Sequence, residues 1–112
     1  MRISFEGIGQ VMATFLADDC QEGHVCTVEE HGAVKTAGAR EDFWGVVQHV
    51  DQGKAAVILE GFVTVSYSGS HFDPGIRNLS SDGNGGVMLD EDGKAYMVVS
   101  VNYAGRTCVI KL

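Results

Sequence analysis

Apolar and polar positions alternate along much of the chain in short runs, which is the pattern of half-buried β-strands. The clearest run follows Gly61, where Val63, Val65 and Tyr67 alternate with small hydroxyl residues. We expect one face of this strand to be buried and the other to face water. Further runs predict the strands Trp44–Val50, Ala55–Glu60, Val87–Leu89, Ala95–Val101 and Thr107–Leu112.

Turn-forming residues separate these runs. Asp51–Lys54 joins two of them as a hairpin, with Gly53 where a positive φ is needed. Gly61 interrupts an otherwise long strand, which indicates a bulge or a barrel corner. Further turns are predicted at Asp90–Gly93 and Asn102–Gly105, and a loop from Gly69 to about Asn84.

The stretch from Gln10 to Glu22 contains no glycine and fits two patterns. Met12, Phe15 and Leu16 have the spacing of a helical stripe, whereas alternate residues from Val11 to Phe15 share one face of a strand. We favour the strand. No window of the chain combines a sustained period of 3.6 residues with capping residues, so we expect no helix longer than about three turns.

Composition agrees with a β structure. The 112 residues include 15 glycines, about twice the usual share of roughly 7%. Val occurs 15 times and Leu only 5 times, a bias typical of strands. We predict an all-β fold, a small barrel or sandwich of short antiparallel strands with Gly-rich turns. Residues 1–112 form one domain in this interpretation, with residues 1–20 as an N-terminal arm or a first strand.

Charge narrows the set of partners. Asp and Glu number 15 against 8 Lys and Arg, so the net charge is −7. Such a surface repels phosphate, and we expect no binding to nucleic acid or to anionic membranes. No apolar run approaches the roughly 20 residues of a membrane span. The N-terminus carries Glu6 and lacks the apolar stretch of a secretory signal, so we expect no export.

Four potential zinc ligands, Cys20, His24, Cys26 and His31, lie within twelve residues. Their spacing, C-x3-H-x-C-x4-H, matches no common zinc ribbon or finger. A Cys/His metalloprotein stays a hypothesis, but we favour a structural role and predict no metal or other cofactor. Three cysteines without an export signal are expected to be reduced.

The residue types of a hydrolase are also present. Cys26 has His31 nearby in sequence, and Ser70 is followed by His71 and Asp73. Neither set lies in a recognisable nucleophile motif, and neighbours on an extended chain point to opposite faces. We therefore assign no catalytic residue and expect a protein that is not an enzyme.

Phe43 and Trp44 are adjacent aromatic residues that follow the charged turn Arg40–Asp42. Two roles are open: they fill the core, or they anchor an interface, where aromatic side chains concentrate binding energy. A different functional class is a small ligand-binding β module for a sugar or a peptide. That module would use Trp44, Tyr67 and the loop around His71.

From about Gly23 to Leu112, the order of these elements resembles the small capsid decoration, or head-stabilising, proteins of phages and prophages. The segments that carry the resemblance are Gly23–Cys26, Phe43–Val47, Ala55–Val65, Gly75, Leu79, Gly83–Gly86, Tyr96–Val99 and Val109–Leu112. The resemblance implies a small β-rich barrel, commonly trimeric, which sits outside the shell and cements neighbouring capsomers. The implied partners are further copies of the chain and the major capsid protein. The implied location is the capsid exterior, after synthesis in the bacterial cytoplasm.

Overall fold

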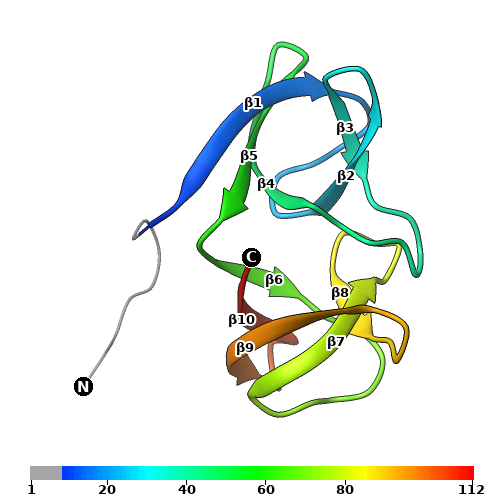
Figure 1. Cartoon of the computed structure of the whole chain (residues 1–112), viewed down its shortest axis with the longest axis vertical. Coiled ribbons are helices and arrows are strands. Elements are labelled where there is room, and N and C mark those ends of the chain that lie inside the picture. Colours follow the sequence, from blue (N-terminus) through cyan, green and yellow to red (C-terminus); the bar gives the residue numbers. More distant parts are fainter. Residues whose placement is uncertain (1–8) are drawn as a thin grey trace.

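The computed structural model describes residues 9–112, which form two β-sheets one above the other (Figure 1). Every regular element in this part of the chain is a strand, which confirms the predicted all-β fold. The strands are β1 (Val11–Ala17), β2 (Val25–Glu30), β3 (Ala33–Thr36), β4 (Gly45–Asp51), β5 (Lys54–Glu60), β6 (Phe62–Ser66), β7 (Gly75–Ser81), β8 (Val87–Leu89), β9 (Lys94–Asn102) and β10 (Thr107–Lys111).

The first sheet is a closed barrel in the order β1-β3-β2-β4-β5. Its pairs are antiparallel except for β1 and β3, which run parallel. The predicted hairpin between β4 and β5 is confirmed, with Gln52 and Gly53 both at positive φ in its turn. Closure of the barrel removes the free edges that a Val-rich sheet would otherwise expose.

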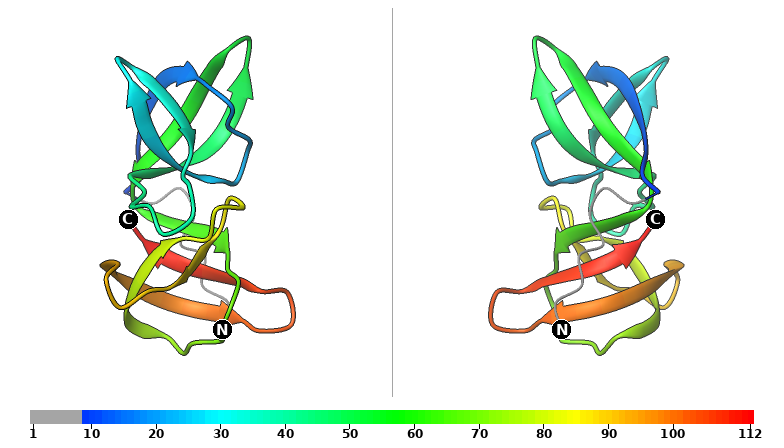
Figure 2. Two further views of the ribbon diagram at one scale, coloured as in Figure 1. Left: turned by 90° about the vertical axis from the view of Figure 1, so that its right-hand side faces the viewer. Right: turned by 90° about the vertical axis from the view of Figure 1, so that its left-hand side faces the viewer.

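The second sheet has the order β6-β10-β9-β7-β8, with antiparallel neighbours throughout. An isolated parallel bridge between Tyr67 and Val87 brings β8 back toward the end of β6, so the sheet curls strongly. Figure 2 shows the barrel and this sheet stacked along the long axis of the molecule. Leu112 donates its N–H to the carbonyl of Gly61, so the C-terminal residue is held in the sheet as expected.

Gly61 is the point at which the chain leaves the barrel and enters the second sheet. Its φ of 114° lies in the region that favours glycine, and a Cβ there would meet the Gln10 side chain at 2.9 Å. Beyond it, Val63, Val65 and Tyr67 are buried, whereas Thr64 is exposed. The predicted corner and the predicted alternation are both confirmed.

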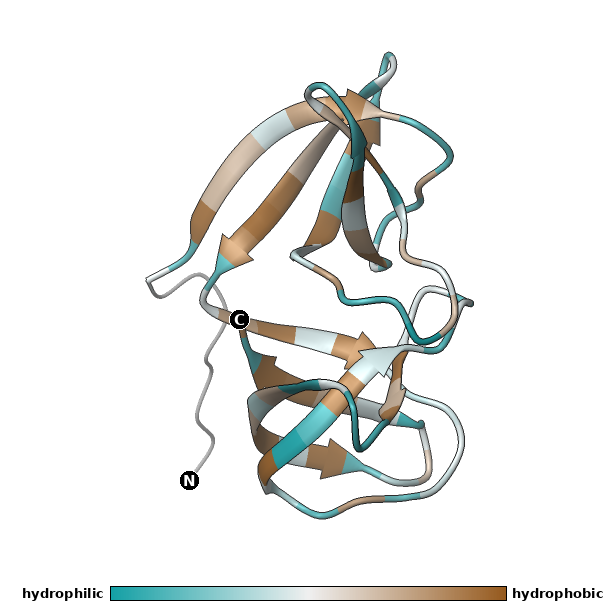
Figure 3. Cartoon of the chain, turned by 45° about the vertical axis from the view of Figure 1, so that its right-hand side comes forward, coloured by the Kyte–Doolittle hydropathy of each residue, from teal (hydrophilic) through white to brown (hydrophobic). Residues whose placement is uncertain are grey.

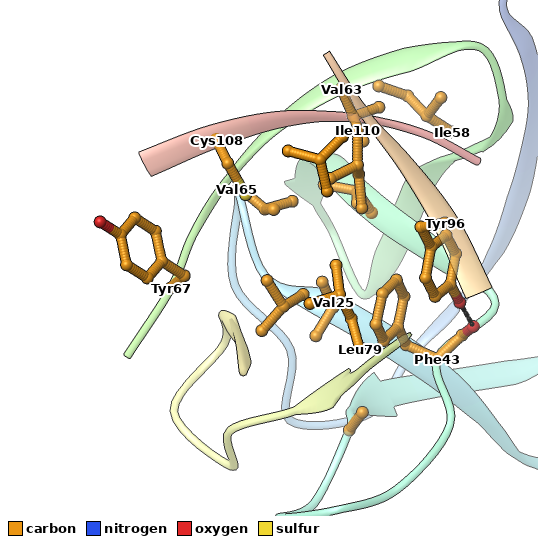
Figure 4. Close-up of a cluster of buried hydrophobic side chains, with 14 of the residues drawn as sticks. Val25, Phe43, Ile58, Val63, Val65, Tyr67, Leu79, Tyr96, Cys108 and Ile110 are labelled. Carbon is orange, nitrogen blue, oxygen red and sulfur yellow. Dashed lines mark hydrogen bonds between the residues drawn. The ribbon is translucent and has the colours of Figure 1, made fainter. Parts of the chain in front are cut away.

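The main core lies between the two sheets and joins them into one body. Hydrophobic residues recur along the strands of both sheets (Figure 3), and side chains of the two sheets, such as Ile58 of β5 and Val63 of β6, meet in one cluster (Figure 4). The main core consists of Val25, Ala37, Phe43, Val46, Ile58, Val63, Val65, Tyr67, Phe72, Leu79, Val87, Tyr96, Val98, Cys108 and Ile110. A smaller barrel core consists of Cys26, Val34, Val47, Ala55 and Val57.

Two strands lie where the sequence predicted none. The predicted loop from Gly69 to Asn84 contains β7, which pairs with both β9 and β8. Its sequence lacks an apolar alternation because the inward residue Ser81 is polar. Ser81 is fully buried, and its hydroxyl donates to the carbonyl of Ala37 at 2.9 Å. The other strand, β3, lies between the resembling segments Gly23–Cys26 and Phe43–Val47, where the sequence predicted no element.

The structure describes the N-terminal region only from residue 9 onward, so it tests only some of the predictions made for that region. The strand favoured between Gln10 and Glu22 is confirmed as β1. It pairs with β5 along most of its length, which favours the extended form over a helix. The first eight residues, where an arm and the absence of a secretory signal were expected, lie outside the described part of the chain.

Candidate interaction surface around Trp44

Phe43 and Trp44 point in opposite directions from the segment that leads into β4. Phe43 is 2% exposed and belongs to the main core, whereas Trp44 is 62% exposed. The N–H of Trp44 donates to the carbonyl of Cys26 at 2.8 Å, which holds this segment along β2. Adjacent side chains of an extended backbone lie on opposite faces, so burying Phe43 forces Trp44 outward. Of the two roles left open by the sequence, Phe43 has the core role.

Trp44 is one of the residues that line a small apolar hollow in the barrel. The hollow has a volume of about 20 Å³ and is lined by Phe15, Cys26, Thr27, Val28, Val34, Trp44, Gly45, Val57 and Leu59. Val28 on its rim is 53% exposed. Trp44, Val28 and the half-buried Phe15 and Leu59 all line this hollow, and we call these four residues the Trp44 patch.

Gly45 makes this arrangement possible. A Cβ on Gly45 would lie 2.5 Å from Cγ1 of Val57 and 2.7 Å from the carbonyl oxygen of Ile58. Only a residue without a side chain lets β4 approach β5 this closely as it enters the barrel. This close approach of β4 to β5 fixes the backbone next to Trp44, and therefore the point from which its side chain projects.

The side chain of Lys94 borders the Trp44 patch. The Nζ atom of Lys94 lies 5.7 Å from the centre of the Trp44 ring and 5.6 Å from the centre of the Tyr96 ring. Both distances are within the range of cation–π attraction. Burial, with a smaller contribution from the charge of Asp42, raises the pKa of Tyr96 to about 12. The Tyr96 hydroxyl is therefore neutral at physiological pH, and the charged groups near it include Lys94 and Asp42.

An exposed Trp beside an apolar hollow and a cation suits the binding of a protein surface. Trp is among the residues that most often dominate the binding energy of protein interfaces. A partner with an apolar side chain for the hollow and a carboxylate for Lys94 would match both features. The geometry thus favours recognition of a macromolecular surface.

The four potential zinc ligands do not converge. Cys26 points into the barrel core and is 1% exposed, whereas His31 lies in the exposed turn after β2, roughly 16 Å further along the strand. His24 packs against Gly85, and its Nδ1 atom is 3.1 Å from the hydroxyl of Thr36. Among residues 9–112, no three His, Cys, Asp or Glu side chains are grouped closely enough to hold a metal ion.

Burial also changes the chemistry of the cysteines. It raises the pKa of Cys26 to about 12, with a smaller contribution from Cys20, and that of Cys108 to about 11. Burial likewise raises the pKa of the half-buried Cys20. These thiols stay protonated at neutral pH, whereas a nucleophilic cysteine needs its thiolate. Cys26 and His31 are not in contact as a nucleophile and its base would be.

The loop with Ser70, His71 and Asp73 is held by aromatic residues. The Tyr67 hydroxyl is hydrogen-bonded to Nδ1 of His71 at 2.7 Å. The Tyr103 hydroxyl donates to the Asp73 carboxylate at 2.5 Å. These contacts fix the loop to the rest of the sheet and do not link Asp73 to His71.

Trp44 and Tyr67 do not share a binding site. Trp44 lies near Lys94 at the start of β9, whereas Tyr67 follows β6 and forms an isolated bridge with Val87 of β8. Figure 4 shows Tyr67 and Phe43 at opposite ends of the main core. Tyr67 is also buried, so its ring is not available to a ligand.

The sequence did not single out Val28 or Lys94. Val28 follows three consecutive buried residues of β2, so no alternation along this strand marks it as exposed. Lys94 looks like the polar end of a hairpin turn. Both join Trp44 only through the pairing of strands that are distant in sequence.

Comparison with family models and with curated proteins found no relative of this chain. Within the described residues, no helix is long and apolar enough to cross a membrane. The function is therefore inferred from the residues and their geometry.

Proposed function

We propose that this chain is a structural protein of a phage or prophage virion, which decorates and cements the outside of the capsid as a homotrimer. Its partners would be further copies of itself and the major capsid protein. It would fold in the bacterial cytoplasm and then join the shell. The observation that carries this proposal is the Trp44 patch, where an exposed Trp beside an apolar hollow suits a protein partner.

The resemblance to capsid decoration proteins supports the proposal. The resembling segments Gly23–Cys26, Phe43–Val47 and Ala55–Val65 lie at β2, β4 and across β5 and β6. The later segments Tyr96–Val99 and Val109–Leu112 lie in β9 and at β10. The resemblance thus coincides with both sheets rather than with one isolated motif.

The construction of the fold suits a cementing role. One core spans the barrel and the second sheet, so load applied to either sheet is passed to the other. Tight turns connect the strands and leave few long loops. A net charge of −7 keeps such a protein from binding the nucleic acid packaged nearby.

A trimer would bury the Trp44 patch in a head-to-tail contact. Such contacts use two different surfaces on each subunit and close into a ring when the rotation allows it. The abundant carboxylates of the chain supply acidic surfaces that Lys94 of a neighbouring copy would attract. Specific interfaces typically bury about 800 Å² per partner, of which Trp44 would supply the anchor.

The test has two measurements on the purified chain. Sedimentation over a hundredfold dilution series should show a trimer that dissociates as it is diluted. Heads assembled without this protein, from the phage whose genome encodes it, should bind it in a pelleting assay. A chain that stays monomeric at every concentration and leaves the heads bare would overturn the proposal.

A further inference from the structure

A second surface feature lies between the barrel and the second sheet, apart from the Trp44 patch. It is a groove of about 630 Å³ lined by Gln10, Glu22, Gly23, Val46, Val47, Gln48, Ile58, Phe62, Val63 and Thr64. One wall comes from β4 and the other from β6, which face each other across the middle of the molecule (Figure 1). What sets this groove apart is that β6 is the terminal strand of its sheet.

The register of β6 against β10 shows where its backbone groups point. Leu112 donates to the carbonyl of Gly61 at 2.9 Å, and Tyr67 donates to the carbonyl of Arg106 at 3.0 Å. In an antiparallel pair, hydrogen-bonded residues alternate with residues that point away. The odd-numbered residues from 61 to 67 therefore bond to β10. The N–H and C=O of Thr64 point to the outer edge, into the groove.

Within residues 9–112, the ends of this edge are covered and no backbone pairs with its middle at Thr64. At one end, the side-chain amide of Gln10 donates to the carbonyl of Phe62 at 3.4 Å. At the other end, the N–H of Ser68 donates to the carbonyl of Val87 at 3.0 Å. Thr64 lies between them and is exposed. The open stretch has room for a short extended segment with its own backbone donors and acceptors.

The side chains of the groove favour one kind of segment. Three apolar residues that line its inner part, Val46, Ile58 and Val63, are each less than 10% exposed, beside polar lining residues such as Gln48. Among the described residues that line it, Glu22 alone is ionisable, and it has a hydrogen bond of 2.7 Å to Nδ1 of His49. An extended segment places alternate side chains on opposite sides, so one apolar side chain would face the inner part and a basic one would reach Glu22.

We propose that this groove binds an extended segment of a partner protein, which adds as a short strand to the outer edge of β6 at Thr64 and carries a basic side chain toward Glu22. Strand addition of this kind takes its affinity from backbone hydrogen bonds and its specificity from alternate side chains. The groove uses none of the Trp44 patch. The proposal therefore stands independently of the capsid role.

The probe is a capped hexapeptide of alternating Val and Thr with one central Lys, titrated into the ¹⁵N-labelled chain. The amide signals of Thr64 and Gln48 should shift. Thr64→Pro removes the edge donor but no bond to β10, because proline is tolerated where the N–H faces away from the sheet. It should weaken binding at least about tenfold, roughly one lost backbone hydrogen bond. Thr64→Ala, which keeps the N–H, should bind like wild type.

A separate experiment tests the attraction between Glu22 and the basic side chain of the peptide. This experiment does not require Thr64→Pro to fold. Glu22→Gln should weaken the Lys peptide severalfold, and a peptide with Glu in place of Lys should bind wild type correspondingly less well. Unshifted Thr64 signals at millimolar Lys peptide would overturn the proposal, as would equal binding by folded Thr64→Pro. If Thr64→Pro instead abolished self-association and no peptide bound, the groove would belong to a second copy.

Discussion

The hydroxyl of Tyr96 donates a hydrogen bond to the main-chain carbonyl of Phe43 at 3.2 Å, while the two rings stack with their centres 4.8 Å apart and their planes within 6° (Figure 4). Tyr96 belongs to β9 of the second sheet. Phe43 belongs to the segment that leads into the barrel at β4. This pair therefore ties the two sheets together and fixes the backbone from which Trp44 projects.

Tyr96→Phe should destabilise the fold. The ring stack survives this change, but the buried Phe43 carbonyl loses the hydroxyl donor, at a cost of about 1–3 kcal/mol. Urea unfolding of the two proteins measures the difference. Tyr103→Phe is the matched control, since the Tyr103 hydroxyl bonds Asp73 at the exposed surface and should cost less. Equal losses in the two variants would mean that the Tyr96 bond does not join the sheets.

The same hydroxyl predicts an alkaline transition. The pKa of Tyr96 is raised to about 12, mainly by burial, so the neutral form stabilises the fold. This contribution is complete below pH 10 and is lost as the pH rises through about 12. The melting temperature of wild type should exceed that of Tyr96→Phe at pH 8, and the gap should narrow above pH 10. Cys26 and Cys108 are present in both proteins, so their ionisation cancels. A gap that stays constant to pH 11.5 would contradict the assignment.

Trp44→Ala should weaken self-association without harming the fold. Truncation of an interface anchor costs about 2 kcal/mol or more, which is roughly a thirtyfold rise in Kd. Because Trp44 is 62% exposed, the stability of the monomer should change by no more than about 0.5 kcal/mol. Ile76→Ala is the control, since Ile76 is 63% exposed on the other sheet. Sedimentation of both variants across a dilution series decides the matter, and equal weakening by Ile76→Ala would remove Trp44 from the interface.

Gly45→Ala should destabilise the barrel by about 1–3 kcal/mol. The new Cβ would lie 2.7 Å from the Ile58 carbonyl oxygen, a backbone atom that cannot move aside without shifting β5. Gly38→Ala provides the control, because a Cβ there meets nothing closer than 3.8 Å. Thermal unfolding should show a loss for Gly45→Ala alone. A neutral result would mean that β4 does not approach β5 this closely.

We expect the contribution of Glu29 to the stability of the fold to change with pH. A hydrogen bond with the Asp18 side chain, followed by small effects of burial and of the Asp18 charge, raises the pKa of Glu29. A carboxyl with a raised pKa stabilises the fold below its unfolded pKa and loses that contribution as the pH rises through its folded pKa. Glu29→Gln should therefore melt higher than wild type at pH 7, with a smaller difference near pH 4. Glu30→Gln removes an equal charge away from Asp18, and an identical profile for it would refute the contact.

The sequence by itself determined the class of the fold and most of its strands. A side-chain period of two is a local property of extended backbone, so the alternation from Val63 to Tyr67 identified the buried face before any partner strand was known. The turn at Gly53 and the corner at Gly61 were equally local, because both depend on a backbone conformation that glycine adopts without strain.

Only the tertiary structure decided whether a given polar or aromatic side chain, such as that of Ser81, Phe43 or Trp44, faces the core or the solvent. β7 was missed because Ser81, on its inward face, is polar and is satisfied by the Ala37 carbonyl, which lies 44 residues away in sequence. Phe43 and Trp44 are adjacent and both aromatic, so no local pattern says which is buried. Pairing with β2 and stacking on Tyr96 turned Phe43 inward, and the alternation of the backbone then left Trp44 in solvent.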